Sequence, residues 1–116
     1  MQFRLLGATL LVTACAQGVP QRPAEMDALL DSYFSCIQKE VALSMSARVD
    51  PYLSVDGAVA ECDVHVLAIE KAHRREGFSS DVVRTSRRIV TDEGRKLGVQ
   101  AAAFIARNQG SAPIGR

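Results

Sequence analysis

Residues 26–41, MDALLDSYFSCIQKEV, carry the clearest helical pattern in this chain. Apolar side chains recur there every three or four residues, with polar residues such as Asp31 and Lys39 between them. Because an α-helix has 3.6 residues per turn, this spacing gathers the apolar side chains on one face. Pro23 suits the first turn, and the pattern fades over residues 44–48. The residues expected on the apolar face are Met26, Leu29, Leu30, Tyr33, Phe34, Cys36, Ile37 and Val41.

A second amphipathic helix is predicted after the turn signal Asp50-Pro51. Ser54 is the expected N-cap, and the helix should run to about Arg75, where Gly77 suits a C-terminal stop. The apolar stripe of this helix consists of Val55, Val59, Cys62, Val66 and Ile69.

Cys36 and Cys62 both lie on apolar faces, each 13 residues from Val49 in the middle of the connection. Such positions face each other in an antiparallel helical hairpin. If the chain is exported, as its first residues indicate (described below), these two thiols most simply form one disulfide. We therefore predict a Cys36–Cys62 bond that closes a loop of about 26 residues.

A third helix is predicted from a cap at Ser79, Ser80 or Asp81 to Asn108. Its core stripe is expected to hold four residues spaced by seven, namely Val83, Val90, Leu97 and Phe104.

Small residues spaced by four also follow one line along this third helix: Gly94, Gly98, Ala102 and Ala106. They allow two interpretations. Either another helix approaches closely along this line, or the helix bends or breaks near Gly94. The predicted fold is thus all-α, a disulfide-linked antiparallel hairpin with a third helix that is long or broken.

The first residues have the layout of a secretory signal, with one charge at Arg4, an apolar run over 5–12 and small residues after it. The run is shorter than the ~20 residues that span a bilayer. Val12-Thr13-Ala14-Cys15 resembles the lipobox of bacterial lipoproteins. The pattern Ala14-Cys15-Ala16 also fits ordinary signal peptidase, which would release a soluble periplasmic or secreted protein starting at Gln17.

The lipoprotein resemblance implies cleavage before Cys15 and acylation of that residue, which would anchor the chain to a membrane. Ala16 after the cysteine implies the outer membrane of a Gram-negative cell. The predicted organisation is a signal peptide at 1–14, a tether at 15–23, a helical domain at 24–108 and a flexible tail at 109–116. Beyond the signal, the chain is loosely similar to small two-cysteine helical periplasmic proteins, which implies no particular function.

Composition and charge exclude one class of function and suggest a binding surface. The 116 residues contain no Trp, and the formal net charge is +1, which argues against a general nucleic-acid binder. Charge is nevertheless divided, with net −6 over residues 15–70 and net +6 over residues 71–116. The two parts can partly neutralise each other within one chain, or the basic part can bind an acidic partner protein, a second copy or an anionic surface. The arginines predicted to bind such a partner are Arg84, Arg87, Arg88 and Arg95.

Catalytic motifs are not recognisable, and we expect no enzyme and no cofactor. Cys62 and His65 have a spacing found in zinc sites, but a disulfide would consume the thiol, so a small metal-binding protein is a less favoured class. The favoured function is a membrane-anchored envelope protein that acts through protein contacts. A soluble inhibitor or ligand-binding module is the alternative.

Overall fold

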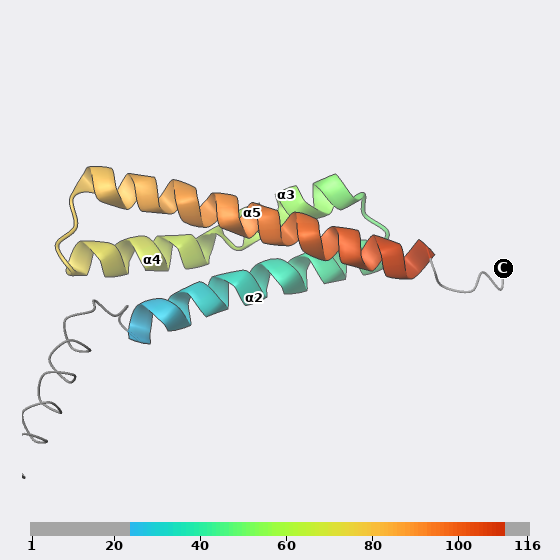
Figure 1. The fold of residues 1–116 in the computed structure, drawn as a ribbon, viewed down its shortest axis with the longest axis horizontal. Helices are drawn as coiled ribbons and strands as arrows, with labels where there is room; N and C mark the ends of the chain where they lie inside the picture. Colours follow the sequence, from blue (N-terminus) through green and yellow to red (C-terminus); the bar gives the residue numbers. More distant parts are fainter. Residues whose placement is uncertain (1–23, 111–116) are drawn as a thin grey trace, which may run out of the picture.

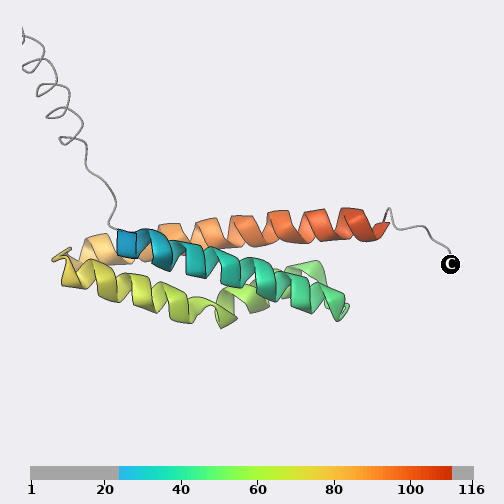
Figure 2. The ribbon, with the colours of Figure 1, turned by 90° about the horizontal axis from the view of Figure 1, so that it is seen from below.

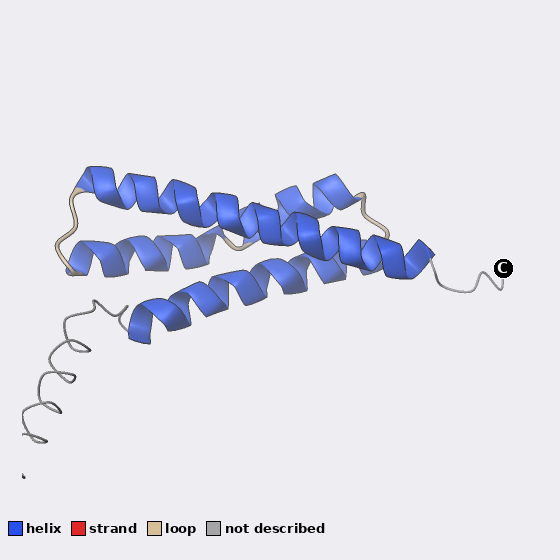
Figure 3. Ribbon diagram, in the orientation of Figure 1, coloured by secondary structure: helices blue, strands red, loops and turns tan. Residues whose placement is uncertain are grey.

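The computed structural model describes residues 24–110, which form helices joined by short loops (Figure 1). No strand occurs in this range (Figure 3). The predicted signal peptide, Cys15, the tether and residues 111–116 of the predicted tail lie outside the described residues. The helices are α2 (Ala24–Ser46), α3 (Pro51–Glu61), α4 (Asp63–Arg75) and α5 (Ser80–Gly110).

The helices run up, down and up. α3 and α4 together return antiparallel to α2, and α5 then runs in the direction of α2 (Figures 1 and 2). α5 contacts α2, α3 and α4, so it closes the hairpin along its whole length. The predicted all-α fold is confirmed, and so is the antiparallel hairpin with a third helix packed across it.

The disulfide between Cys36 and Cys62 is formed, with 5.9 Å between the two Cα atoms. Cys62 is fully buried and is the single residue between α3 and α4. The prediction of one unbroken second helix was therefore wrong at Cys62. The backbone turns there, at φ −88° and ψ 2°, directly at the point where the second helix is bonded to α2.

The start of α3 differs from the expectation. Asp50, not Ser54, is the N-cap, and its Oδ1 accepts hydrogen bonds from the N–H groups of Tyr52 at 2.9 Å and Leu53 at 3.3 Å. Pro51 occupies the first turn, where its missing N–H costs nothing. Ser54 is buried inside the helix, and its hydroxyl donates to the carbonyl of Val49.

The connection between α4 and α5 has the predicted signals. Gly77 adopts a positive φ of 88°, a conformation that favours glycine after a helix. The N–H of Phe78 donates to the carbonyl of His73, which satisfies one of the last helical acceptors. Ser79 caps α5, with its Oγ accepting from the N–H of Val82 at 3.3 Å.

The core is made chiefly by α2 and the returning helices. Tyr33, Ile37 and Val41 of α2 are completely buried. They pack in one cluster with Val55, Ala58, Cys62, Val66, Ile69 and Ala72. Leu29, Leu30, Phe34, Cys36 and Val59 cover the edges of this cluster. The predicted apolar faces of the first two helices are thus confirmed.

α5 is continuous through Gly94 and Gly98, which resolves the open alternative in favour of close approach. A Cβ atom at Gly94 would lie 2.6 Å from Cζ of Tyr33, so the ring of Tyr33 occupies the space that a side chain would need. At Gly98 a Cβ would lie 3.2 Å from Val55 and 3.4 Å from Ile37. The two glycines let the backbone of α5 rest directly on the hairpin.

The expected seven-residue core stripe holds at the start of α5 and fails at its end. Val83 is 2% exposed and Val90 packs against the core, but Phe104 is 59% exposed. A strict seven-residue spacing drifts by about 20° per repeat on a straight α-helix, and three repeats separate Val83 from Phe104. The inward face has passed to Ala101, Ala102 and Ile105 by that point.

Gly94→Ala should lower the free energy of unfolding by about 1–3 kcal/mol, because the added methyl group collides with the Tyr33 ring. The matched control is Gly57→Ala in α3, where nothing lies within 4 Å of an added Cβ. The free energy of unfolding of that variant should rise by up to about 1 kcal/mol, because Ala has a higher helix propensity than Gly. Urea unfolding measures both values, and a stabilising Gly94→Ala would contradict the close approach.

Replacing both cysteines, as Cys36→Ala with Cys62→Ala, should lower the free energy of unfolding by about 3–4 kcal/mol. The reason is that a cross-link between residues 26 positions apart no longer restricts the unfolded chain. Urea unfolding of the variant, beside the oxidised and the reduced parent chain, measures this. Equal stability of all three samples would show that the bond does not hold the hairpin together.

Candidate interaction surface

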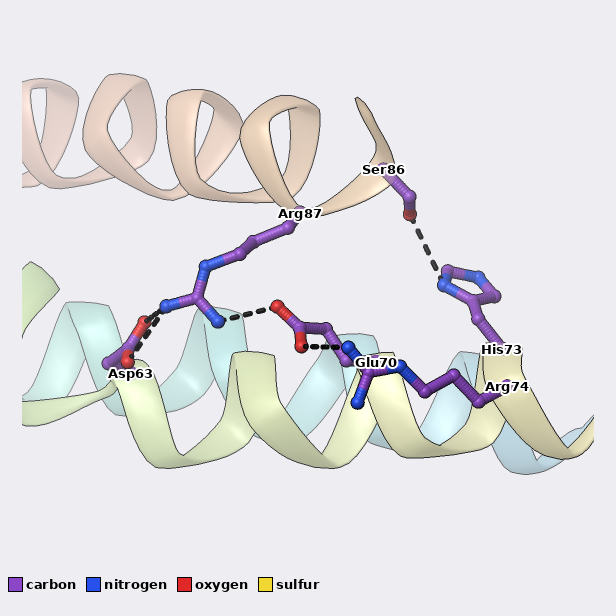
Figure 4. A network of polar contacts seen from close by, with 6 residues as sticks. All are labelled: Asp63, Glu70, His73, Arg74, Ser86 and Arg87. Atoms are coloured by element: carbon purple, nitrogen blue, oxygen red, sulfur yellow. Dashed lines mark hydrogen bonds and ion pairs between the residues drawn. The ribbon is translucent and has the colours of Figure 1, made fainter. Parts of the chain in front are cut away.

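A polar network joins α4 to α5 (Figure 4). Arg87 of α5 points at α4, where its Nη1 donates to Glu70 at 2.5 Å and its Nη2 donates to Asp63 at 2.9 and 3.0 Å. Glu70 is nearly buried, with 12% of its side chain exposed, and it also pairs with Arg74 at 3.6 Å. The hydrogen bond to Glu70 raises the pKa of Arg87 above its ordinary value. Arg87 therefore serves as a fixed cation between two helices.

His73 and Ser86 make a second link between the same helices. Nδ1 of His73 lies 3.3 Å from Oγ of Ser86, and the imidazole ring meets the ring of Phe78 edge-on. Both polar side chains are partly buried. The contact fixes the end of α4 against the first turns of α5.

Ion pairs join the acidic and basic parts of the chain in two further places. Arg95 of α5 donates to Asp56 of α3 at 2.5 Å, and Arg75 at the end of α4 pairs with Glu25 at the start of α2. Together with the contacts of Arg87, they show that the two parts partly neutralise each other within one chain. This was one of the two alternatives left open by the sequence.

The structure divides the predicted set of partner-binding arginines. Arg87 and Arg95 bond to the hairpin, and Arg84 pairs with Asp81 on its own helix. Among residues 24–110, Arg88 is exposed and makes no ion pair. The four side chains thus do not form one free basic patch, and their role in binding a partner stays a prediction.

The hydroxyl of Tyr33 lies in an unusual environment beneath α5. It is buried and has no hydrogen-bond partner in the described part of the chain. Burial raises the pKa of Tyr33 above its ordinary value, and the negative charge of Asp63 raises it further. A buried hydroxyl without a hydrogen-bond partner lowers the stability of the folded state by roughly 1–3 kcal/mol. The packing of the Tyr33 ring against Gly94 therefore carries this cost.

Across the described range, no three His, Cys, Asp or Glu side chains are placed to hold a metal ion. Of the two residues considered for zinc, Cys62 is bonded to Cys36 in the disulfide.

The side of α5 that faces away from the hairpin exposes an apolar stripe that the sequence analysis did not consider. Val82, Ile89 and Val99 are 48%, 55% and 51% exposed. Open grooves lie along this side and are lined by Val82, Thr85 and Ile89 and by Ile89, Lys96 and Val99. We call the whole exposed side that bears this stripe the outer face of α5. Its residues are Val82, Thr85, Ile89, Asp92, Lys96, Val99, Ala103 and Ala106, all exposed.

The start of α3 extends the outer face sideways. Pro51 and Tyr52 line a third groove together with Val99, Ala103 and Ala106. Tyr52 is 82% exposed, and the neighbouring Leu53 is also largely exposed. Large apolar side chains placed together in solvent mark a surface suited to a protein partner.

Comparisons with known protein families, with curated proteins and with solved structures return no match. Among the described residues, none of the helices is both long and apolar enough to cross a membrane.

Arg87→Met should lower the free energy of unfolding by about 1–3 kcal/mol, because it leaves the nearly buried Glu70 without its main partner. The matched control is Arg84→Met, which removes only a highly exposed pair and should change stability by less than about 0.5 kcal/mol. Urea unfolding compares the two. Equal effects would show that the network adds nothing to the contact between α4 and α5.

Proposed function

We propose that this protein is a lipid-anchored lipoprotein of the bacterial cell envelope, and that its helical domain acts as a structural or accessory protein-interaction module without catalysis. The lipid is attached at Cys15, and residues 15–23 tether the domain to the outer membrane on its periplasmic side. The soluble, exported form of the same domain is the alternative.

Support for the anchor comes from the sequence and from the disulfide. Val12-Thr13-Ala14-Cys15 has the lipobox pattern after an apolar run. The remaining two cysteines are bonded to each other, which is typical of proteins that fold in an oxidising compartment. Cys15 is then the one cysteine left over for another role.

Support for a protein-interaction role comes from one observation above all, the exposed apolar stripe on the outer face of α5. The helix that bears it is held by Arg87, by Arg95 and by the close contact at Gly94. A surface fixed in this way loses little conformational freedom when it binds.

For the anchor, we expect the intact mass of the protein, purified from bacterial membranes, to equal that of residues 15–116 plus acyl chains, with no free thiol. Cys15→Ser should abolish the added lipid mass and release the chain from the membrane, because the thiol is the attachment point. A mature chain that starts at Gln17 without lipid would favour the soluble alternative.

For the interaction role, a photocrosslinking amino acid at Ile89 should give a covalent adduct with another polypeptide in intact cells, because this position is exposed at the centre of the apolar stripe. The control position is Lys71 on the exposed side of α4. Gel analysis and mass spectrometry identify the adducts. Equal crosslinking, or none, at both positions would contradict a specific surface on α5.

A further inference from the structure

The residues of the outer face of α5 are placed symmetrically about the level of Gly94. They are spaced alternately by three and four, the spacing of a seam between two packed helices. Counted outward from the level of Gly94, Ile89 stands five residues before it and Val99 five residues after it. Thr85 and Ala103 are equally matched, and so are Val82 and Ala106.

The charges on this face are matched with opposite sign. Asp92 lies two residues before Gly94 and Lys96 lies two residues after it, and both are exposed. Lys96 reaches Glu93 at 3.2 Å on its own helix, whereas Asp92 makes no ion pair within the described part of the chain. One acid on this face is therefore left for a partner.

A second copy of α5 fits this pattern in one direction only. Running antiparallel, it places Ile89 against Val99 and Asp92 against Lys96, each pair occurring twice. Running parallel in register, it places Asp92 against Asp92 and Lys96 against Lys96, which costs free energy. The antiparallel arrangement has the twofold symmetry of most protein dimers.

We propose that a second copy of this chain packs antiparallel on the outer face of α5, with the twofold axis at the level of Gly94. The apolar pairs lie on both sides of a central pair of Asp92–Lys96 contacts. This rests on the proposed function, because it names the partner of the interaction module.

Tyr52 adds to the same surface. It lines the groove beside Ala103 and Ala106, at the far end of the stripe from Val82. In the antiparallel dimer, the first turns of the partner's α5 lie over Ala103 and Ala106. They would therefore cover the ring of Tyr52, which is the most exposed large apolar side chain of the described residues.

The test uses two differently tagged full-length chains expressed together, with capture through one tag and detection of the other. Asp92→Lys alone places Lys against Lys, and Lys96→Asp alone places Asp against Asp. Either change, made in both copies, should lower co-capture about tenfold or more. One copy with Asp92→Lys and the other with Lys96→Asp restore opposite charges at both contacts, and co-capture should return.

Lys71→Asp is the matched control, since it reverses the charge of an exposed lysine on α4 and should leave co-capture unchanged. Circular dichroism of each variant shows that it is folded. The inference is overturned if the unchanged chains are not captured together, or if the mixed pair behaves like either single variant. If Ile89 gives an adduct with a different protein and the two tagged chains are not captured together, the dimer is wrong but the proposed interaction role is supported.

Discussion

The contact between the backbone of α5 and the ring of Tyr33 constrains the whole bundle. At Gly94 the two helices approach so closely that no side chain fits between them, and at Gly98 the space is nearly as tight. At this level α5 contributes backbone to the core, and its core side chains Val83, Val90 and Ile105 lie before and after the two glycines. The large apolar residues of α5 that remain, such as Ile89 and Val99, lie on its opposite side.

Charge reinforces this arrangement. The acidic hairpin and the basic third helix attract each other, and the attraction is focused at Arg87 and Arg95. Arg87 bridges Asp63 at the start of α4 and Glu70 two turns later, which fixes both the distance and the rotation of α5. The outer face of α5 itself carries one acid, Asp92, and one base, Lys96.

The sequence predicted the helices, the hairpin and the disulfide from local spacing and from the expectation that the chain is exported. The errors have separate causes. Ser54 has the side chain of an N-cap, yet Asp50 before Pro51 binds the free N–H groups and Ser54 is buried. The break at Cys62 coincides with the bond to Cys36 across the hairpin, a long-range contact that the pattern of a single helix does not contain.

The candidate surface was harder to foresee. The sequence drew attention to the arginines, but the partners of Arg87 and Arg95 lie 17 to 39 residues away along the chain and could not be paired without the fold. The second apolar stripe of α5 was visible as Val82, Ile89 and Val99 at helical spacing. Only the orientation of α5, set by Gly94 and Gly98, shows that this stripe faces solvent.

The two tyrosines give the molecule a built-in pair of optical reporters. The chain has no tryptophan, so its intrinsic fluorescence comes from Tyr33 and Tyr52 alone. One ring is sealed beneath α5 and the other is almost bare. In a single chain, a dissolved quencher such as iodide will therefore extinguish the emission of Tyr52 and spare that of Tyr33. A partner that covers Tyr52 will protect its emission as well, so that core and surface can be followed separately without any label.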